Sequence, residues 1–437
     1  MILDKIKKKS VLILGFGREG QDTFLFLRKK FPKKILGVAD KLPFENLSPD
    51  AKKLLYSNSY DRRKESIKMH LGKNYLNALK NYDVIIKSPG ISPYLIAPFI
   101  TKKQRITSQT EIFFENCEGT IIGVTGTKGK STTASLCYAV LKRAGLKAHL
   151  VGNIGKPALQ FLETTGPDDI FVYELSSFQL TNMKQSPHIA VFLNLYPEHL
   201  DYYQGSFQAY ANAKANITTH QTPTDFLIYN ENDPVVAKIA RQSKAQKIPF
   251  NPVRNRISDR QDFVASVEPA ILIGKLFGIP ENKLQQAIKN FKPLPHRLER
   301  VGEYEKIIFY NDSLATIPQA TIQAINLLGP KLHTLIAGGF DRGVSFDKLG
   351  KHIEKSSIKT LILFPTTGEK ILKSIKEKPQ YFFVKNMKEA VELCFRETPK
   401  GSICLLSPAS SSFNMFKDYK DRGDQFKKFI MNHGKKK

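Results

Sequence analysis

The residues of this chain that are best suited to chemistry lie in the run Thr125-Gly-Thr-Lys-Gly-Lys-Ser-Thr132. Glycines let backbone N–H groups converge on phosphate oxygens, and a helix that begins at such a turn adds the positive end of its dipole. We expect Lys130 to reach the outer phosphates of a nucleoside triphosphate, and Ser131 or Thr132 to bind Mg²⁺. A glycine-rich surface turn is the alternative interpretation.

The elements that must position this run flank it directly. An apolar stretch, Thr120-Ile-Ile-Gly-Val124, predicts a buried strand before it, and residues 133–144 show apolar side chains at helical spacing. Strand, glycine-rich turn and helix are the context in which a phosphate loop functions. One departure is Val124, which stands where the strict pattern has its first glycine. The predicted ATP-binding residues of the loop are Gly126, Thr127, Lys128, Gly129, Lys130, Ser131 and Thr132.

A second glycine-rich turn, Gly15-Phe-Gly-Arg-Glu-Gly20, follows a predicted strand at Val11–Leu14 and precedes a predicted helix at Gln21–Lys30. Asp40 lies about 20 residues further on, where dinucleotide-binding folds place a ribose-binding acid. By itself this pattern suggests a nicotinamide enzyme. The same turn can hold any diphosphate, including that of a nucleotide sugar. A tight turn that only allows close helix packing is the structural alternative.

Three side chains beyond the loop could support phosphate chemistry. Glu174 follows the predicted strand Ile170–Tyr173, and a carboxylate at the carboxyl end of a parallel strand is well placed to bind Mg²⁺. His199 follows another predicted strand, and Lys214 lies in a helical stretch of small residues that allows close approach. A structural hydrogen-bonding histidine and an exposed helix lysine are the alternatives.

The last third of the chain opens after the proline-rich segment Phe291-Lys-Pro-Leu-Pro-His296. Arg297 follows it and could fold over a γ-phosphate, while Asp312, at the end of a predicted strand, could bind a ribose. Salt-bridge and turn roles are equally compatible with their spacing.

Strands that alternate with helices predict an α/β fold with parallel sheets, in three blocks. We place the blocks at residues 1–108, 109–295 and 296–437. The strands expected after the first are Lys34–Ala39, Asp83–Lys87, Thr120–Val124, Ile170–Tyr173, Ile189–Asn194, Phe226–Tyr229, Ile307–Tyr310, His333–Ala337, Thr360–Phe364 and Ser402–Leu406.

The net charge of +27 is the unusual feature of the composition. A basic surface can attract nucleic acid or a small polyanion, or can keep a protein in solution. No zinc-finger or ribonucleoprotein pattern accompanies the charge, so we expect no nucleic-acid partner. There is no long apolar stretch and no signal peptide, and the four cysteines form no pairs at close spacing. We therefore expect a cytoplasmic protein without membrane attachment.

Taken in order, the motifs of this chain resemble those of the Mur ligase family, the ATP-dependent amide-bond formers of peptidoglycan synthesis. The resemblance covers nearly the whole chain. It is carried by the two glycine-rich turns and by Ser88-Pro-Gly-Ile91, Gly152-Asn-Ile-Gly155, Glu174-Leu-Ser-Ser-Phe-Gln179, Glu198-His-Leu-Asp201, Leu294-Pro-His-Arg297, Asn311-Asp-Ser313, Gly338-Gly-Phe-Asp-Arg-Gly343 and Leu405-Leu-Ser-Pro-Ala-Ser410. The first glycine turn and the motif at 174–179 favour the branch that adds D-glutamate.

This resemblance implies a Rossmann-like N-terminal domain for a UDP-sugar, a central domain like the P-loop ATPases with a parallel sheet, and a Rossmann-like C-terminal domain for the amino acid. It implies that a carboxylate of UDP-N-acetylmuramoyl-L-alanine attacks the γ-phosphate of ATP. D-glutamate then displaces phosphate from the acyl phosphate. ATP and Mg²⁺ are the implied cofactors, the partners are these small molecules, and we expect a monomer.

The resemblance also assigns residues. Lys130, His199 and Lys214 match catalytic positions, with Lys214 as a carbamylated lysine. Metal ligands match Ser131, Glu174, His199 and the Lys214 carbamate, and ATP contacts match Arg297 and Asp312. The UDP-sugar positions are Gly15, Gly17, Arg18, Gly20, Asp40, Ser88 and Asn153, and the D-glutamate positions are Arg342, Ser412 and Tyr419.

Several positions depart from the family pattern. Leu314 stands in place of a lysine, and Lys128 in place of a more common asparagine. Residues 262–266 lack the usual adenine-contacting asparagine, with Ser266 at its end, and the segment 247–262 is short. A family member with another amino-acid substrate, including a folate-type glutamate ligase, is one alternative. A degenerate ligase that binds without rapid turnover is the other.

Overall fold

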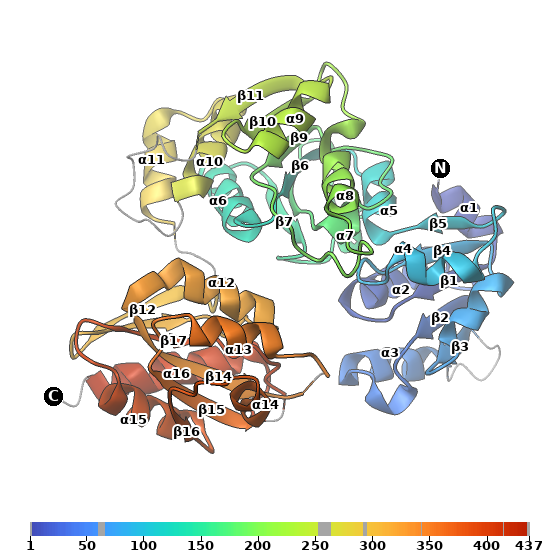
Figure 1. The fold of residues 1–437 in the computed structure, drawn as a ribbon. Coiled ribbons are helices and arrows are strands. Elements are labelled where there is room, and N and C mark those ends of the chain that lie inside the picture. The colour runs from blue at the N-terminus through green and yellow to red at the C-terminus, as the bar shows by residue number, and fades with distance from the viewer. Residues whose placement is uncertain are drawn as a thin grey trace. The chain divides into compact units, whose positions relative to one another are not determined.

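The computed structural model describes residues 2–59, 66–251, 264–291, 295–341, 343–413 and 415–434. The chain forms two compact units, residues 1–291 and residues 292–437. The first unit holds two sheets and the second unit holds one, with helices on the faces of each sheet (Figure 1). The fold is thus α/β, as the alternation of strands and helices predicts.

The first sheet has the strand order β3-β2-β1-β4-β5, and all of its neighbours are parallel. Its strands are β1 (Val11–Leu14), β2 (Leu36–Asp40), β3 (Ile67–Leu71), β4 (Val84–Lys87) and β5 (Arg105–Thr107). Its helices are α1 (Ile2–Lys8), α2 (Arg18–Lys30), α3 (Pro49–Ser59) and α4 (Pro93–Ile96).

The second sheet has the order β11-β10-β9-β6-β8-β7 and is also parallel throughout. Its strands are β6 (Thr120–Thr125), β7 (Ala148–Gly152), β8 (Ile170–Glu174), β9 (Ile189–Phe192), β10 (Phe226–Asn230) and β11 (Gln246–Phe250). Its helices are α5 (Gln109–Asn116), α6 (Lys130–Arg143), α7 (Ser177–Leu180), α8 (Phe207–Thr219), α9 (Pro234–Gln242), α10 (Val264–Leu276) and α11 (Glu281–Lys289).

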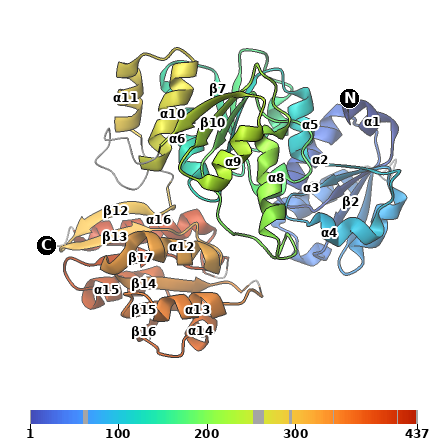
Figure 2. The ribbon, with the colours of Figure 1, turned by 45° about the horizontal axis from the view of Figure 1, so that its top comes forward.

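Alternate residues of β6 divide the second sheet between two cores. Ile122 and Val124 pack with residues of α6, α10 and α11, whereas Ile121 packs in a cluster that includes α5, α8 and α9 (Figure 2). The cluster around Ile121 continues to the first sheet and its helices, where it includes Ile13 of β1 and Phe24 of α2. One continuous apolar core therefore joins the first two sheets, and the division at residue 108 stays a prediction.

The third sheet has the order β12-β13-β17-β14-β15-β16. Its strands are β12 (Glu299–Tyr304), β13 (Ile307–Asn311), β14 (Leu332–Gly339), β15 (Thr360–Thr366), β16 (Gln380–Phe383) and β17 (Ile403–Leu406). Its helices are α12 (Pro318–Leu328), α13 (Asp347–Glu354), α14 (Thr367–Lys373), α15 (Met387–Glu397) and α16 (Tyr419–Gly434). The expectation of parallel pairing is wrong at β12, which is antiparallel to β13 because a tight turn joins the two.

Among the described helices, none has both the length and the apolar character needed to cross a membrane. The four cysteines form no disulfide, and three of them are buried.

Candidate functional site

A cavity of about 560 Å³ lies at the carboxyl ends of strands from both sheets of the first unit. The carboxyl ends of parallel strands are where α/β folds bind ligands. The glycine turn after β1, the segment after β4 and the segments after β7 and β8 all reach this cavity. Its lining includes Gly15, Gly17, Arg18, Ser88, Asn153, Lys130, His199 and Lys214, which are sequence-predicted site residues. The structure thus brings the two predicted binding turns to one cavity.

The phosphate loop joins β6 to α6. Gly126 and Gly129 have φ angles of 156° and 83°, in the region that favours glycine. Asn194 follows β9, the neighbour of β6 in the sheet, and fixes the loop through two hydrogen bonds. Its Oδ1 accepts from the Lys128 N–H at 2.8 Å, and its Nδ2 donates to the Lys128 carbonyl at 3.1 Å. Val124 is fully buried in β6, so the glycine that begins the turn is Gly126.

Lys130 begins α6 and already has acceptors within the loop. Its ammonium donates to the carbonyl oxygens of Gly126 and Thr127 at 2.9 and 2.7 Å. Ser131 is buried beside it. The Thr127 hydroxyl is within 3.0 Å of the Tyr210 hydroxyl, which ties the loop to α8. A basic group and a hydroxyl therefore lie where a phosphate loop needs them.

Glu174, the last residue of β8, is buried, and only one of its two carboxylate oxygens has a hydrogen-bond partner. Its Oε1 accepts from Asn153 Nδ2 at 3.2 Å, while Oε2 is buried without a hydrogen-bond partner. A buried carboxylate oxygen without a partner is costly in an apolar environment and suits a cation. In the described part of the chain, no three His, Cys, Asp or Glu side chains converge, so these residues fit a metal only together with other donors.

Lys214 is fully buried in α8 and points into the phosphate loop. Its Nζ donates to the Gly126 carbonyl at 2.8 Å and lies 3.3 Å from the Thr125 hydroxyl. Burial lowers the pKa of Lys214 well below its usual value, and the charge on Lys130 lowers it further. The exposed-lysine alternative is therefore wrong, and burial favours the neutral form of this amine.

His199 has a φ of 54° and lines the same cavity. Its ring lies 4.9 Å from the Phe178 ring, and its Nε2 lies 3.8 Å from a Glu198 oxygen. Burial lowers the pKa of His199, and Glu198 opposes this effect. A neutral imidazole can donate a nitrogen lone pair to a metal.

The first glycine turn is shaped by Ser88. The Ser88 hydroxyl donates to the Gly15 carbonyl at 2.9 Å, and a Cβ at Gly15 would lie 2.7 Å from that hydroxyl. Gly20 lets α2 pack closely against the turn at Gly15, because a Cβ at Gly20 would clash with the Gly15 carbonyl oxygen. Asp40 accepts from the N–H groups of Phe16 and Leu42 at 2.6 and 2.9 Å. Its observed contacts therefore shape the turn, and a ribose contact stays a prediction.

Glu19 is a cavity residue that the sequence reasoning did not select, although it lies inside the first glycine motif. Its Oε1 accepts from Gln179 Nε2 at 2.8 Å, and its Oε2 is buried without a hydrogen-bond partner. Burial raises the pKa of Glu19 to about 7, with Arg18 and Lys87 opposing. Burial also lowers the pKa of Lys87 to about 8. Only the fold shows that this carboxyl is enclosed.

The second unit places Asp312 at the end of β13, where it is buried. Its Oδ2 accepts from the Ser407 hydroxyl at 2.8 Å and its Oδ1 from the Leu298 N–H at 3.1 Å. Burial raises the pKa of Asp312 to about 7, and Arg297 opposes this effect. Leu314, in place of the expected lysine, donates its N–H to the His296 carbonyl at 2.9 Å.

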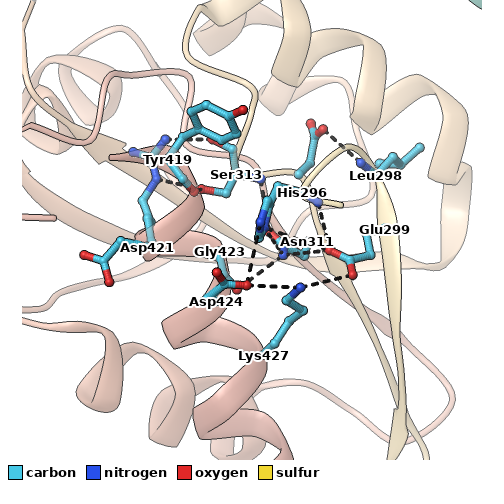
Figure 3. A network of polar contacts seen from close by, with 12 residues as sticks. His296, Leu298, Glu299, Asn311, Ser313, Tyr419, Asp421, Gly423, Asp424 and Lys427 are labelled. Carbon is cyan, nitrogen blue, oxygen red and sulfur yellow. Dashed lines mark hydrogen bonds and ion pairs between the residues drawn. The ribbon is translucent and has the colours of Figure 1, made fainter. Parts of the chain in front are cut away.

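A polar network joins His296, Asn311 and Glu299 (Figure 3). Asn311 Nδ2 lies 3.0 Å from His296 Nδ1 and donates to Glu299 Oε2 at 3.1 Å. Lys427 of α16 pairs with Glu299 at 3.2 Å. His296 has a φ of 64°, so these contacts hold a strained backbone immediately before Arg297.

The structure describes two of the three residues predicted to bind D-glutamate, Ser412 and Tyr419. Ser412 is buried, and the Tyr419 carbonyl accepts from the Ser313 hydroxyl at 2.7 Å. Arg342 lies outside the described residues. Arg422, which the sequence did not indicate, is fully buried and donates to the Ser313 hydroxyl and carbonyl at 3.0 and 2.8 Å. Of the region 262–266, the described Ser266 accepts a hydrogen bond from the Thr133 hydroxyl at 2.9 Å.

Comparison with known proteins gives two family matches. Residues 124–266 match the Mur ligase middle domain, and residues 296–410 match the Mur ligase glutamate ligase domain. The UDP-N-acetylmuramoylalanine–D-glutamate ligase of Streptococcus pyogenes serotype M1 is 34% identical over 456 residues, which cover 97% of each chain.

Solved structures show the same fold at low sequence identity. UDP-N-acetylmuramate-alanine ligase from Thermotoga maritima gives a TM-score of 0.54 at 14% identity, over 98% of this chain and 100% of that one. MurF ligase from Thermotoga maritima, solved in complex with ADP, gives 0.54 at 15% identity, over 97% of this chain and 95% of that one.

Proposed function

Because the chain belongs to the Mur ligase family, we propose that it adds D-glutamate to UDP-N-acetylmuramoyl-L-alanine with hydrolysis of ATP to ADP and phosphate. The observation that carries the proposal is that one cavity is lined by the first glycine-rich turn, by Lys130 of the phosphate loop and by the buried Lys214. A nucleotide sugar at the first turn and a triphosphate at the second would then have their reacting ends in the same enclosure. The identity of 34% over nearly the full length favours D-glutamate over the other amino acids of the family.

The reaction begins with attack of the substrate carboxylate on the γ-phosphorus of ATP. The new O–P bond gives an acyl phosphate, and the bond to the β-γ bridging oxygen breaks to release ADP. Lys130 would exchange its two loop carbonyls for phosphate oxygens and offset the charge that develops there. The loop N–H groups, which Asn194 holds in place, would orient the phosphates.

The second step is attack of the D-glutamate amine on the acyl carbonyl carbon. The C–N bond forms through a tetrahedral intermediate, the amine loses a proton, and phosphate leaves with the acyl oxygen. Enclosure of the acyl phosphate in the cavity would limit attack by water. Closely held reactants also gain rate from orientation.

Lys214 is proposed to act as a carbamate. Its neutral amine would form an N–C bond with CO₂ and lose a proton, which turns a buried amine into an anion. Ser131, Glu174, His199 and this carbamate are the residues that would hold Mg²⁺, which when bound supplies positive charge to the phosphates. The unpartnered Glu174 Oε2 supports this donor set.

The remaining site residues are also assigned proposed binding roles. Gly15, Gly17, Arg18, Gly20, Asp40, Ser88 and Asn153 are proposed for the UDP-sugar, Arg297 and Asp312 for ATP, and Arg342, Ser412 and Tyr419 for D-glutamate. We also propose that the protein is a monomer that acts in the cytoplasm. Light scattering of the purified protein tests the first of these two statements.

The deciding test measures phosphate release from ATP by the purified protein. Release that requires both UDP-N-acetylmuramoyl-L-alanine and D-glutamate supports the proposal. Release with another amino acid would identify a different member of the family. ATP binding without release under any substrate pair would identify a degenerate ligase.

A further inference from the structure

A second cavity in the first unit lies apart from the catalytic one and has a volume of about 770 Å³. Five of the residues that line it are lysines: Lys7, Lys8, Lys9, Lys34 and Lys68. The others are Ser10, Ile35, His70, Asn81 and Tyr82. The described lining therefore contains no aspartate or glutamate, and it concentrates positive charge in a concave surface.

The position of this basic cavity separates it from the chemistry described above. Ser10 directly precedes β1 and Ile35 directly precedes β2, so the cavity lies beside the amino ends of these two strands, and Lys68 and His70 extend it along the edge strand β3. Gly15 and Ser88, at the carboxyl ends of β1 and β4, line the catalytic cavity instead. The two cavities share no lining residue.

The lysines are brought together by contacts within the fold. Lys34 Nζ donates to the carbonyl of Lys7 at 3.2 Å and to that of Lys9 at 2.7 Å, so its charge lies against the end of α1. His70 and Tyr82, which also line the cavity, are joined by a 2.9 Å contact between Nε2 and the hydroxyl. The neighbouring Asp83 is engaged by the Ser10 N–H and hydroxyl at 3.0 and 2.8 Å.

The charges in this cavity act on one another. Burial lowers the pKa of Lys34, and Asp83 opposes this effect. Burial and the charge on Lys68 lower the pKa of His70. A concave surface of one sign focuses the field and attracts counter-ions. A bound anion would relieve this repulsion.

We propose that the basic cavity binds a compact compound with several phosphate groups, at a site separate from the catalytic cavity. Lysine ammonium groups serve phosphates as point charges. Small-molecule sites typically occupy about 300–1,000 Å³, a range that includes this volume. A polymer or a membrane would need an extended or flat basic face, whereas these five lysines converge on one hollow. Five of the lysines that contribute to the positive net charge are thus gathered at one place.

The test uses inorganic tripolyphosphate as the probe and calorimetry as the measurement. The variant Lys8→Ala/Lys9→Ala/Lys68→Ala removes three exposed charges from the cavity. The control Lys53→Ala/Lys102→Ala/Lys103→Ala removes three exposed charges elsewhere in the same sheet block. The phosphate loop is present in all three proteins, so any difference among them isolates the basic cavity. Ligase turnover is expected to be unchanged in both variants.

We expect the cavity variant to lose one of the tripolyphosphate sites that wild type and control share. If the site is retained, its affinity in the cavity variant should be lower by at least about tenfold. Acetylation of lysines in the wild-type protein, read by mass spectrometry, should show protection of Lys8, Lys9 and Lys68 by the probe. This measurement stands even if the triple variant folds poorly, and Lys68→Ala alone provides a milder variant.

Two further arms identify the ligand. Equal binding of GTP and tripolyphosphate would show that phosphates alone are recognised, while tighter GTP binding would indicate a nucleotide. The proposal is overturned if the cavity variant binds tripolyphosphate as the control does, or if the lysines are not protected. It is also overturned if only a single-stranded RNA or an anionic vesicle binds there.

Discussion

Lys130 and Lys214 donate hydrogen bonds to the same oxygen, the carbonyl of Gly126, at 2.9 and 2.8 Å. Two amines on one acceptor repel each other if both are charged, and the pKa of the buried Lys214 is lowered for this reason among others. We propose that this arrangement divides the roles, with Lys130 serving the phosphates and the buried Lys214 reacting with CO₂.

Replacement of Lys214 tests this division. Lys214→Ala should lower turnover about 100-fold or more, because the charge of the proposed Lys214 carbamate is lost. Formate or acetate should restore part of the activity by occupying the space of the carbamate. Steady-state phosphate release measures both effects. The exposed Lys238→Ala on α9 is the matched control, and equal losses in the two variants would contradict the assignment.

Glu19 predicts a pH dependence of stability. Its pKa is raised to about 7 from an ordinary value of 4.5, so between these values the folded chain holds a proton that the unfolded chain has lost. The free energy of unfolding therefore falls as the pH rises through this window. Glu19→Gln removes the titration and keeps an acceptor for Gln179. Its melting temperature should exceed that of wild type at about pH 8 and match it at about pH 4.

The charged neighbours of Glu19 are the same in both proteins, and a second variant serves as the control for the melting-temperature comparison. Arg18 and Lys87 favour the charged form of Glu19, and Asp22 disfavours it. All three remain in the variant, so the difference between the two proteins reports on Glu19. Glu45→Gln changes an exposed carboxylate and should leave the melting temperature unchanged across the same range. A constant difference between Glu19→Gln and wild type would show that Glu19 does not titrate as described.

The amide of Asn194 should control ATP affinity. Asn194→Ala removes both of its hydrogen bonds to the backbone of Lys128, which frees the loop to leave its binding conformation. We expect the KM for ATP to rise about tenfold, since each buried polar group left unpaired costs about 1–3 kcal/mol. The KM for D-glutamate should change less. Asn232→Ala, which removes an exposed side-chain contact to Asn251, serves as the control.

Two glycines of the first turn should differ in their tolerance of a methyl group. Gly15 has a φ of 89° and a Cβ there would lie 2.7 Å from the Ser88 hydroxyl, whereas a Cβ at Gly17 meets no atom within 4 Å. Gly15→Ala should lower the free energy of unfolding by about 1–3 kcal/mol. Gly17→Ala, with a φ of −73°, should unfold like the wild type. Denaturant titrations compare them, and equal stabilities would contradict the geometry.

The strands that the sequence indicates are those with neighbours on both sides. Val11–Leu14 and Ile189–Phe192 are buried throughout, so they appear in the sequence as unbroken apolar runs. Edge strands lack this signal. In β3, Lys68 and Met69 are both exposed, and β16 is exposed at most of its length, so no apolar pattern marks either one. The antiparallel β12 was missed for the same reason.

The candidate site divides in a similar way. Motifs indicate Lys130, Ser88 and Asn153 because glycines and strand ends are visible in the sequence. Burial is a property of the folded chain, so the enclosure of Glu19 and the depth of Lys214 could not be read from spacing. Asn194 and Tyr210 hold the loop from other elements, and only the topology brings them there.

The apolar core that runs through the first two sheets limits where domains can be exchanged between related proteins. A chimaera joined at residue 108 would pack a foreign α2 against Phe113 and Phe171, which belong to the same cluster as Phe24. It would also have to preserve the contact from Gln109 Nε2 to Asp22 at 2.7 Å. Residues 1–291 should therefore be inherited and transplanted together.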